Sequence, residues 1–340
     1  MVKVSIIVPV YNVREELLTK CLESLVNQKL DSIEIILVDD ASNNRKTINI
    51  LADYNAKYAS KVVLCTHEIN KKQGGARNTG LNCAKGSYVG FVDADDYVDE
   101  NMFQLLYSKA EEDGADLVDC DYSEVYESGR SIKNRTSIKD VKDPEEYLLN
   151  PGPIWSKIYS KKIIMENRIF FPENIFYEDD AISGMHLLYA NKVSKVKRHL
   201  YYYVKHADAV TANQKYTLGD KTIASSFYID SMMDRGFFDE YQQVIRARYF
   251  KIGFLNTYRQ VIRYRRDYFK ILKALIKRCD EYGIDLDHLL IRKQLSKKQK
   301  HQLELLFKYP EIFLLYESLN QIKAKVVFRL KKLVNYKWLR

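Results

Sequence analysis

The 340-residue sequence has no run of eighteen apolar residues, so we expect no transmembrane helix. Ile6–Val10 is too short for a signal-peptide core and is not followed by a small-residue cleavage site. The five cysteines are scattered and form no Cys-x-x-Cys pair, which disfavours a disulfide framework and a zinc site. These absences favour the reducing cytoplasm.

Two glycine-rich nucleotide-binding motifs are also missing. Residues 9–12, after the first apolar run, contain no glycine, whereas a dinucleotide-binding Rossmann unit has G-x-G-x-x-G there. Gln73–Gly80 is rich in glycine but lacks the Gly-Lys-Ser/Thr ending of a Walker loop. Hydride transfer and P-loop phosphate transfer are therefore disfavoured.

Hydrophobic residues make up 46% of the chain and charged residues 29%, which is enough apolar material for a folded core. The charge is uneven, because residues 241–340 contain 24 basic and 8 acidic residues and the first 240 contain 30 basic and 37 acidic ones. We expect the acidic part to hold a cation and the basic part to meet an anionic partner. Nucleic acid is not expected, since no nucleic-acid-binding fold is recognisable.

Short, β-branched apolar runs alternate with stretches of helical spacing such as Leu17–Val26. The runs are residues 3–9, 33–38, 61–65 and 87–92. The pattern predicts an α/β fold, with a mostly parallel sheet flanked by helices and ligands at the carboxyl ends of its strands. Residues 121–150 are polar with little periodicity and are expected to form a surface excursion. We expect the α/β domain to span 1–215 and a basic, aromatic-rich helical extension to span 216–340.

Carboxylates follow two of the predicted strands. Asp39 and Asp40 come after the second, and Asp93-Ala94-Asp95-Asp96 ends the fourth. Alternate residues on a strand share a face, so Asp93 and Asp95 point toward one spot. Such oxygens suit Mg²⁺ or Mn²⁺. The alternative, for either cluster alone, is that aspartate is simply common in turns after strands.

Four motifs in this order carry a resemblance to a known family: Val4–Asn12, Val38–Ser42, Gly75–Leu81 and Asp93–Asp96. The chain resembles family 2 glycosyltransferases of the GT-A fold, which are inverting enzymes with nucleotide-sugar donors. The resemblance is strong over about the first 100 residues and weaker to about 210. It implies a nucleotide-sugar half over about 1–100 and an acceptor half over about 101–215.

The resemblance implies roles for the donor-binding residues. Pro9 and Tyr11 would form the floor under a uracil ring, and Asp40 would accept the imide N–H. Arg77 would face the nucleotide from a turn that opens a helix, the alternative being a structural salt bridge. Asp93 would reach the ribose or the metal.

For the metal, the resemblance implies that Asp95 ligates Mn²⁺ or Mg²⁺ directly and that Asp96 braces the turn. The general base would be Asp179, in a Glu178-Asp179 pair that opens a largely apolar helix. The alternative is helix N-capping by these carboxylates, and Asp180 is the competing base.

Weaker implications concern the acceptor and the diphosphate. Trp155 would stack on an acceptor sugar, or else anchor the core. Lys157 would neutralise the diphosphate or orient the Glu178–Asp179 loop. Lys205 and His206 would fold over the diphosphate, although the family's usual serine nearby is replaced by Asp208 or Ala209.

We therefore expect a metal-dependent glycosyltransferase that moves a hexose or N-acetylhexosamine from a UDP-sugar to a hydroxyl of a glycan, lipid-linked glycan or glycoprotein. The alternatives are an inactive sugar-binding or scaffold module and a nucleotidyltransferase. We expect a homo-oligomer formed through 216–340. The cationic stretch 322–340 suggests an anionic membrane surface as a second partner, which places the protein in the cytoplasm, with a peripheral position on the inner face of the membrane as the second expectation.

Overall fold

The computed structural model describes residues 1–134, 144–206, 219–264, 268–309 and 312–313. The chain forms two compact units, residues 1–253 and 254–340, and each is described by itself. Helices α8 (Asp220–Asp234) and α9 (Phe238–Tyr249) pack within the first unit, which therefore continues past the boundary expected at residue 215.

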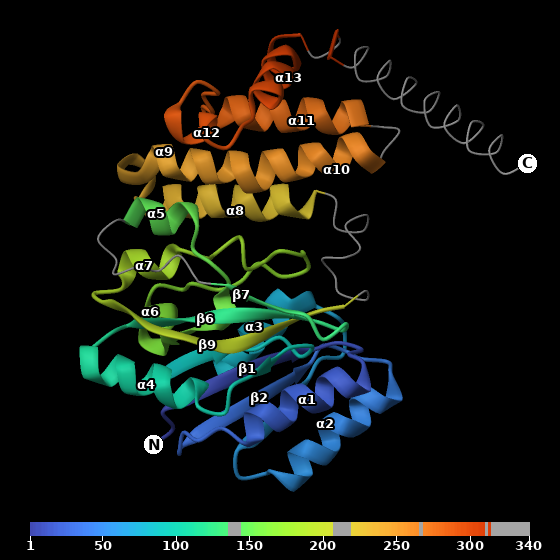
Figure 1. Cartoon of the computed structure of the whole chain (residues 1–340), viewed down its shortest axis with the longest axis vertical. Coiled ribbons are helices and arrows are strands. Elements are labelled where there is room, and N and C mark those ends of the chain that lie inside the picture. The colour runs from blue at the N-terminus through green and yellow to red at the C-terminus, as the bar shows by residue number, and fades with distance from the viewer. Residues whose placement is uncertain (135–143, 207–218, 265–267, 310–311, 314–340) are drawn as a thin grey trace, which may run out of the picture. The chain divides into compact units, whose positions relative to one another are not determined.

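A nine-stranded mixed sheet forms the centre of the first unit, with the order β3-β2-β1-β4-β8-β6-β9-β5 and β7 paired with β6 (Figure 1). The strands are β1 (Val4–Val10), β2 (Ile33–Asp39), β3 (Val62–Thr66), β4 (Tyr88–Phe91), β5 (Tyr97–Val98), β6 (Leu117–Tyr126), β7 (Ser131–Asn134), β8 (Lys157–Ser160) and β9 (Val193–Lys205). The first four are parallel and agree with the predicted runs. Antiparallel β8 joins them to the second half of the sheet, in which β6 and β9 run parallel.

The order of the strands fixes where the first helices lie. The chain crosses from β1 to β3 in one direction and then returns to β4, so right-handed crossovers place α1 (Glu15–Val26) and α2 (Arg45–Lys57) on one face and α3 (Lys72–Cys83) on the other, as in Figure 1. The apolar positions of α1 are buried, as their spacing predicts. Gly80 lets α3 approach β1, because an added Cβ would collide with Ile7.

The expectation of a surface excursion over 121–150 is wrong for the described residues of that stretch. Residues 121–126 continue β6, which pairs with β7 and β9, and α5 (Pro144–Leu149) follows. The strands were missed because this ribbon is only partly buried beyond Asp121 and its outer positions are polar.

The remaining elements of the first unit are the 3₁₀ turn η1 (Ile154–Ser156) and the helices α4 (Met102–Asp113), α6 (Lys161–Glu166) and α7 (Met185–Tyr189). A π-helical segment, Phe250–Leu255, leads into the second unit. The described part of that unit consists of α10 (Asn256–Tyr264), α11 (Tyr268–Glu281), α12 (Leu289–Arg292) and α13 (Lys297–Lys308). No helix among the described residues is both long enough and apolar enough to cross a membrane.

Candidate active site

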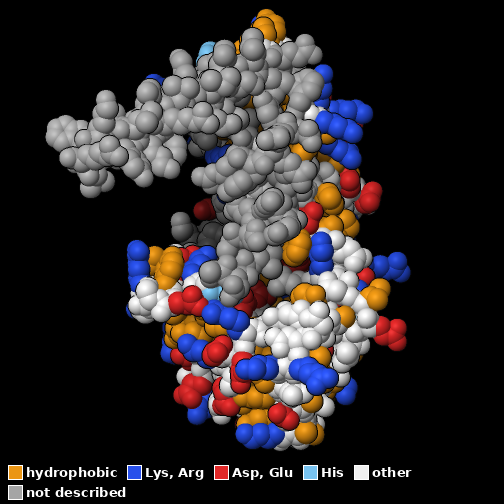
Figure 2. All heavy atoms as spheres, turned by 90° about the vertical axis from the view of Figure 1, so that its right-hand side faces the viewer, with side chains coloured by type: hydrophobic (Ala, Val, Ile, Leu, Met, Phe, Trp, Pro, Cys, Tyr) orange, Lys and Arg blue, Asp and Glu red, His pale blue; other side chains and the backbone are white. Residues whose placement is uncertain are grey.

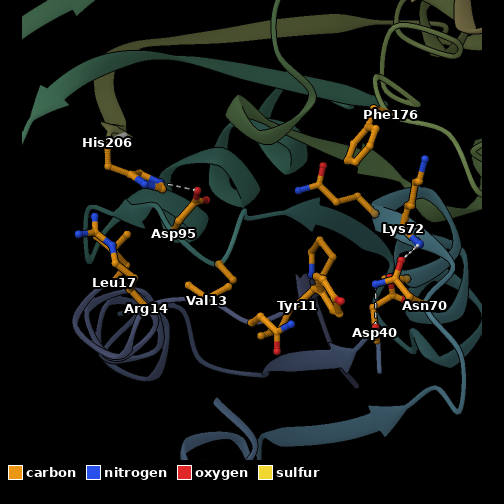
Figure 3. A pocket seen from close by; sticks show the side chains of 16 residues that line it. Tyr11, Val13, Arg14, Leu17, Asp40, Asn70, Lys72, Asp95, Phe176 and His206 are labelled. Atoms are coloured by element: carbon orange, nitrogen blue, oxygen red, sulfur yellow. Dashed lines mark hydrogen bonds and ion pairs between the residues drawn. The ribbon is translucent and has the colours of Figure 1, made fainter. Parts of the chain in front are cut away.

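A cavity of about 250 Å³ opens at the carboxyl ends of β1, β2 and β4. It is lined by Pro9, Val10, Tyr11, Asn12, Val13, Arg14, Leu17, Asp40, Asn70, Lys72, Gln73, Ala76, Ala94, Asp95, Phe176 and His206. Asp40 and Asn70 lie at one end and Asp95 with His206 at the other, with Tyr11 between them (Figure 3). The cavity therefore has two polar ends joined by an aromatic side chain.

Asp40 is the buried carboxylate of the first end, with 2% of its surface exposed. Its Oδ1 accepts the Lys71 backbone N–H at 2.8 Å and lies 2.7 Å from His67 Nδ1. The other ring nitrogen of His67 lies 2.8 Å from Thr79 Oγ1 on α3. Asn70 donates to the Asp40 carbonyl oxygen at 3.0 Å. These contacts fix the carboxylate against the cavity wall.

Sequence analysis missed His67 and Asn70. Both lie between β3 and α3, just before the Gln73–Gly80 segment that the sequence analysis considered. Their position after the apolar run 61–65 could have indicated a place in the site, because parallel strands bring their carboxyl ends to one edge of the sheet.

Asp95 and His206 form the second end. His206 Nε2 lies 2.9 Å from Asp95 Oδ2, and about a third of the Asp95 side chain is exposed. Asp96 turns away from the cavity and accepts hydrogen bonds from Tyr201 Oη at 2.7 Å and from the Val204 backbone N–H at 2.7 Å. Asp96 therefore braces the turn, as expected, and ties it to β9.

Arg77 lies behind the cavity rather than in its lining, and only 2% of its surface is exposed. Its Nη2 donates to Asp93 Oδ1 at 2.8 Å and its Nη1 to Glu178 Oε1. Burial lowers the pKa of Arg77, but Glu178 and Asp93 outweigh that effect and shift it upward. Burial raises the pKa of Glu178 to about 7, against the opposing pull of Arg77, and also raises the pKa of Asp93. The contacts of Arg77 with Asp93 and Glu178 match the alternative role given for Arg77, a structural salt bridge.

The segment that carries Asp179 is a series of turns rather than the start of a helix. Turns extend over 178–184, Gly184 has a φ of +93°, and α7 begins only at Met185. The expected helix at Glu178–Asp179 is therefore wrong, and N-capping does not explain these carboxylates. Burial, followed by the neighbouring charge of Asp179, raises the pKa of Asp180 to about 6.

Trp155 and Lys157 lie in the core, outside the cavity lining. Trp155 is 9% exposed, stacks on Tyr201 with ring centroids 4.1 Å apart and meets Tyr122 edge-on at 4.9 Å. Lys157 is 1% exposed, lies 3.3 Å from Asp119 and donates to the Pro153 carbonyl oxygen at 2.6 Å. These placements match the core-anchor alternative for Trp155 and give Lys157 an internal carboxylate partner.

The remaining weaker residue, Lys205, lies at the end of β9 beside His206, with Nζ 4.0 Å from the centre of the Tyr203 ring and 3.7 Å from Glu124 Oε1. The neighbouring Asp208 and Ala209 lie outside the described residues, as does 322–340. On the face of the first unit drawn in Figure 2, Lys and Arg side chains are interspersed with Asp and Glu. The acidic excess of the first 240 residues therefore does not form a single patch on that face.

Known proteins share this arrangement of strands and helices. The profile of glycosyl transferase family 2 matches residues 5–182. The glycosyltransferase EpsJ of Bacillus subtilis (strain 168) is 33% identical over 224 residues, which cover 61% of this chain and 62% of EpsJ. The poly(ribitol-phosphate) beta-glucosyltransferase of Bacillus spizizenii is 32% identical over 213 residues, which cover 61% of this chain and 33% of that protein. The chain thus matches less than two thirds of the length of these relatives.

A crystal structure of S. aureus TarS 1–349 in complex with UDP-GlcNAc is similar with a TM-score of 0.66 at 20% identity, over 95% of this chain and 92% of that chain. Another of TarS 1–349 gives a TM-score of 0.67 at 21% identity. Similarity at this identity concerns the fold, which is the expected GT-A architecture with a helical C-terminal region. Because the family profile covers more than half of its residues, this chain belongs to glycosyl transferase family 2.

Proposed function

We propose that this glycosyltransferase transfers a hexose or N-acetylhexosamine, with inversion, from a UDP-sugar to a hydroxyl group of a glycan polymer. The observation that carries the proposal is the placement of Asp40 and Asp95 at opposite ends of one cavity, with Tyr11 between them. A uracil ring would lie at the Asp40 end and the diphosphate at the Asp95 end. UDP-GlcNAc in the TarS structure and the acceptor in the B. spizizenii enzyme's name support this class of reaction.

Asp40 would read the base. A carboxylate is an acceptor only, so it favours the uracil imide N–H over the unprotonated N3 of cytosine. The bonds from Lys71 and His67 use Oδ1, which leaves Oδ2 for the base. Pro9 and the half-exposed Tyr11 supply apolar surface beside it.

A divalent ion fits the Asp95 end. In the described part of the chain, no three His, Cys, Asp or Glu side chains are arranged to hold a metal ion by themselves. Mg²⁺ and Mn²⁺ commonly need only one or two carboxylates from the protein, because substrate phosphates supply further ligands. Asp95 would hold the ion with His206 beside it, whereas Asp93 is occupied by Arg77. When bound, the ion would neutralise charge on the departing UDP.

Asp179 is our proposed base, which removes the proton of the acceptor hydroxyl as its oxygen attacks the anomeric carbon. The neighbouring charges favour Asp179 over Asp180. Asp179 lies close enough to Arg77 and Asp93 to influence their charges, and Arg77 lies just behind the cavity, whereas the cations near Asp180 are Arg248, Lys221 and Lys251. Glu178 is held by Arg77 and would orient the loop.

The proposal includes two partners beyond the donor and the acceptor. Residues 216–340 would form a homo-oligomer, and the cationic stretch 322–340 would be a second contact, with an anionic membrane. Light scattering of the full chain, together with sedimentation with anionic and neutral vesicles, tests both. A monomer that binds neither kind of vesicle contradicts both.

A screen of UDP-sugars for metal-dependent UDP release tests the reaction class. We expect release from one UDP-hexose or UDP-N-acetylhexosamine, slowly with water and faster with a polyol-phosphate or glycan acceptor. Formation of UTP and a sugar 1-phosphate from the UDP-sugar and added pyrophosphate would indicate a nucleotidyltransferase, and binding without turnover a scaffold module.

A further inference from the structure

Helix α9 contacts the loop that carries Asp179, although it lies beyond the residues that the family profile matches. Arg248 of this helix is 2% exposed. Its Nη2 donates to the Asp180 carbonyl oxygen at 2.9 Å and to Ser183 Oγ at 3.2 Å. Its Nη1 donates to the Leu148 carbonyl oxygen at 2.9 Å. A single buried guanidinium thus joins α9, α5 and the loop.

The contact reaches Asp179 through Ser183. The Ser183 hydroxyl donates to the Asp179 carbonyl oxygen at 2.7 Å while it accepts from Arg248. The carbonyl groups of both Asp179 and Asp180 are therefore held, one through the serine and one directly. The guanidinium also lies over the Tyr228 ring, 4.2 Å from its centre, which fixes its plane.

Helix α8 contacts the other end of the same loop. Asp220, the first residue of α8, accepts the Phe176 backbone N–H at 3.0 Å. Lys221 Nζ lies 4.4 Å from the centre of the Tyr177 ring, and Tyr177 has a φ of +62°. A left-handed conformation at a tyrosine persists only where its surroundings impose it.

We propose that Arg248 is a positioning residue that sets the orientation of the Asp179 carboxylate, and this rests on the proposed function. The loop is a run of turns and contains no helix to fix it. Within the loop the Asp179 carbonyl oxygen accepts the Ser183 backbone N–H at 2.9 Å, and Arg248 adds hydrogen bonds from outside the loop. Arginine suits this role because its planar fork directs several N–H groups at once, which lysine cannot reproduce.

The experiment compares Arg248→Ala with the wild type and with Arg246→Ala. Arg246 lies on the same helix, where it bonds Gln242 and lies over the Phe238 ring. Three quantities are measured. They are amide hydrogen exchange in peptides covering 178–184, UDP affinity by calorimetry, and the rate at which UDP is released from UDP-GlcNAc in the presence of Mn²⁺ with water as the acceptor.

For Arg248→Ala we expect faster exchange in the loop, UDP affinity within about twofold of wild type, and kcat lower by about tenfold or more, since small misplacements of a catalytic group are costly. Added guanidinium should restore part of kcat in Arg248→Ala and none in Arg246→Ala. A folded Arg248→Ala protein with unchanged exchange and unchanged kcat overturns the proposal.

If Arg248→Ala fails to fold, the variants Arg248→Lys and Ser183→Ala test whether Arg248 positions the loop. Both should lower kcat and increase loop exchange while UDP binding is kept, and wild-type values for both variants overturn the proposal. A wild-type protein that releases no UDP from any UDP-sugar contradicts the proposed function instead. The exchange data still test the role of Arg248 in that case.

Discussion

Arg77 and Glu178 form a buried ion pair that connects α3 to the loop of the proposed base. The same guanidinium bonds Asp93, two residues before the proposed metal ligand Asp95. One cation therefore connects Asp93, after strand β4, to Glu178, the residue that precedes Asp179.

Replacement of Arg77 by Met should destabilise the protein strongly. Buried Glu178 and partly buried Asp93 would lose their cation, and breaking a buried pair costs about 3–5 kcal/mol. Chemical denaturation measures the loss. Lys46→Ala, which removes an exposed ion pair with Glu15, is the control and should leave stability nearly unchanged. An Arg77→Met protein as stable as the control contradicts this interpretation of the cluster.

Glu178 should make stability depend on pH. Its pKa rises from 4.5 to about 7 on folding, so the folded protein binds more protons than the unfolded chain between these values. Its contribution to the free energy of unfolding should therefore be largest below pH 4.5 and fall as the pH rises to about 7. Glu178→Gln should flatten this part of the profile, and equal slopes in both proteins would be the opposing result.

Asp40→Asn should change which nucleotide the protein binds. Loss of the charged acceptor should weaken UDP by about 10- to 100-fold, the usual worth of a hydrogen bond to a charged group. The new amide N–H suits the cytosine N3, so the preference for UDP over CDP should narrow. Competition calorimetry with UDP and CDP measures the ratio of the two affinities. Substitution of the exposed Asp31 by Asn is the control. An unchanged UDP/CDP ratio removes Asp40 from base recognition.

Asp179→Asn should lower turnover by about two to four orders of magnitude, the usual contribution of a general base, with little change in UDP binding. Asp180→Asn is the matched comparison and should have the smaller effect. Steady-state UDP release gives both values. If Asp180→Asn were the more damaging change, the base would be Asp180.

The parallel strands were predictable because buried strands consist of apolar, β-branched runs in the sequence. The two ends of the cavity were predictable because carboxylates follow two of these runs. Asp40 and Asp95 follow such runs directly, and the alternating order of strands and helices brings them to one edge. Gly80 and Arg77 lay in a motif that the family resemblance already singled out.

Burial of polar side chains was not predictable. Lys157 looks like a surface or site residue in the sequence, and only the pairing of β6 with β8 places Asp119 opposite it. Trp155 is likewise covered by Tyr201 from β9, far along the chain. The Arg248 contact could not be foreseen either, because nothing local indicates that α9 packs against α5.

The central claim is that the cavity binds a nucleoside diphosphate, with the base at Asp40 and the diphosphate at Asp95. Calorimetry with uridine and with UDP, in Mn²⁺, tests it in the wild type, Asp40→Ala and Asp95→Ala. We predict that Asp40→Ala weakens both ligands, whereas Asp95→Ala weakens UDP and leaves uridine unchanged. Equal affinity of Asp95→Ala and wild type for UDP, or of Asp40→Ala and wild type for uridine, would contradict the account.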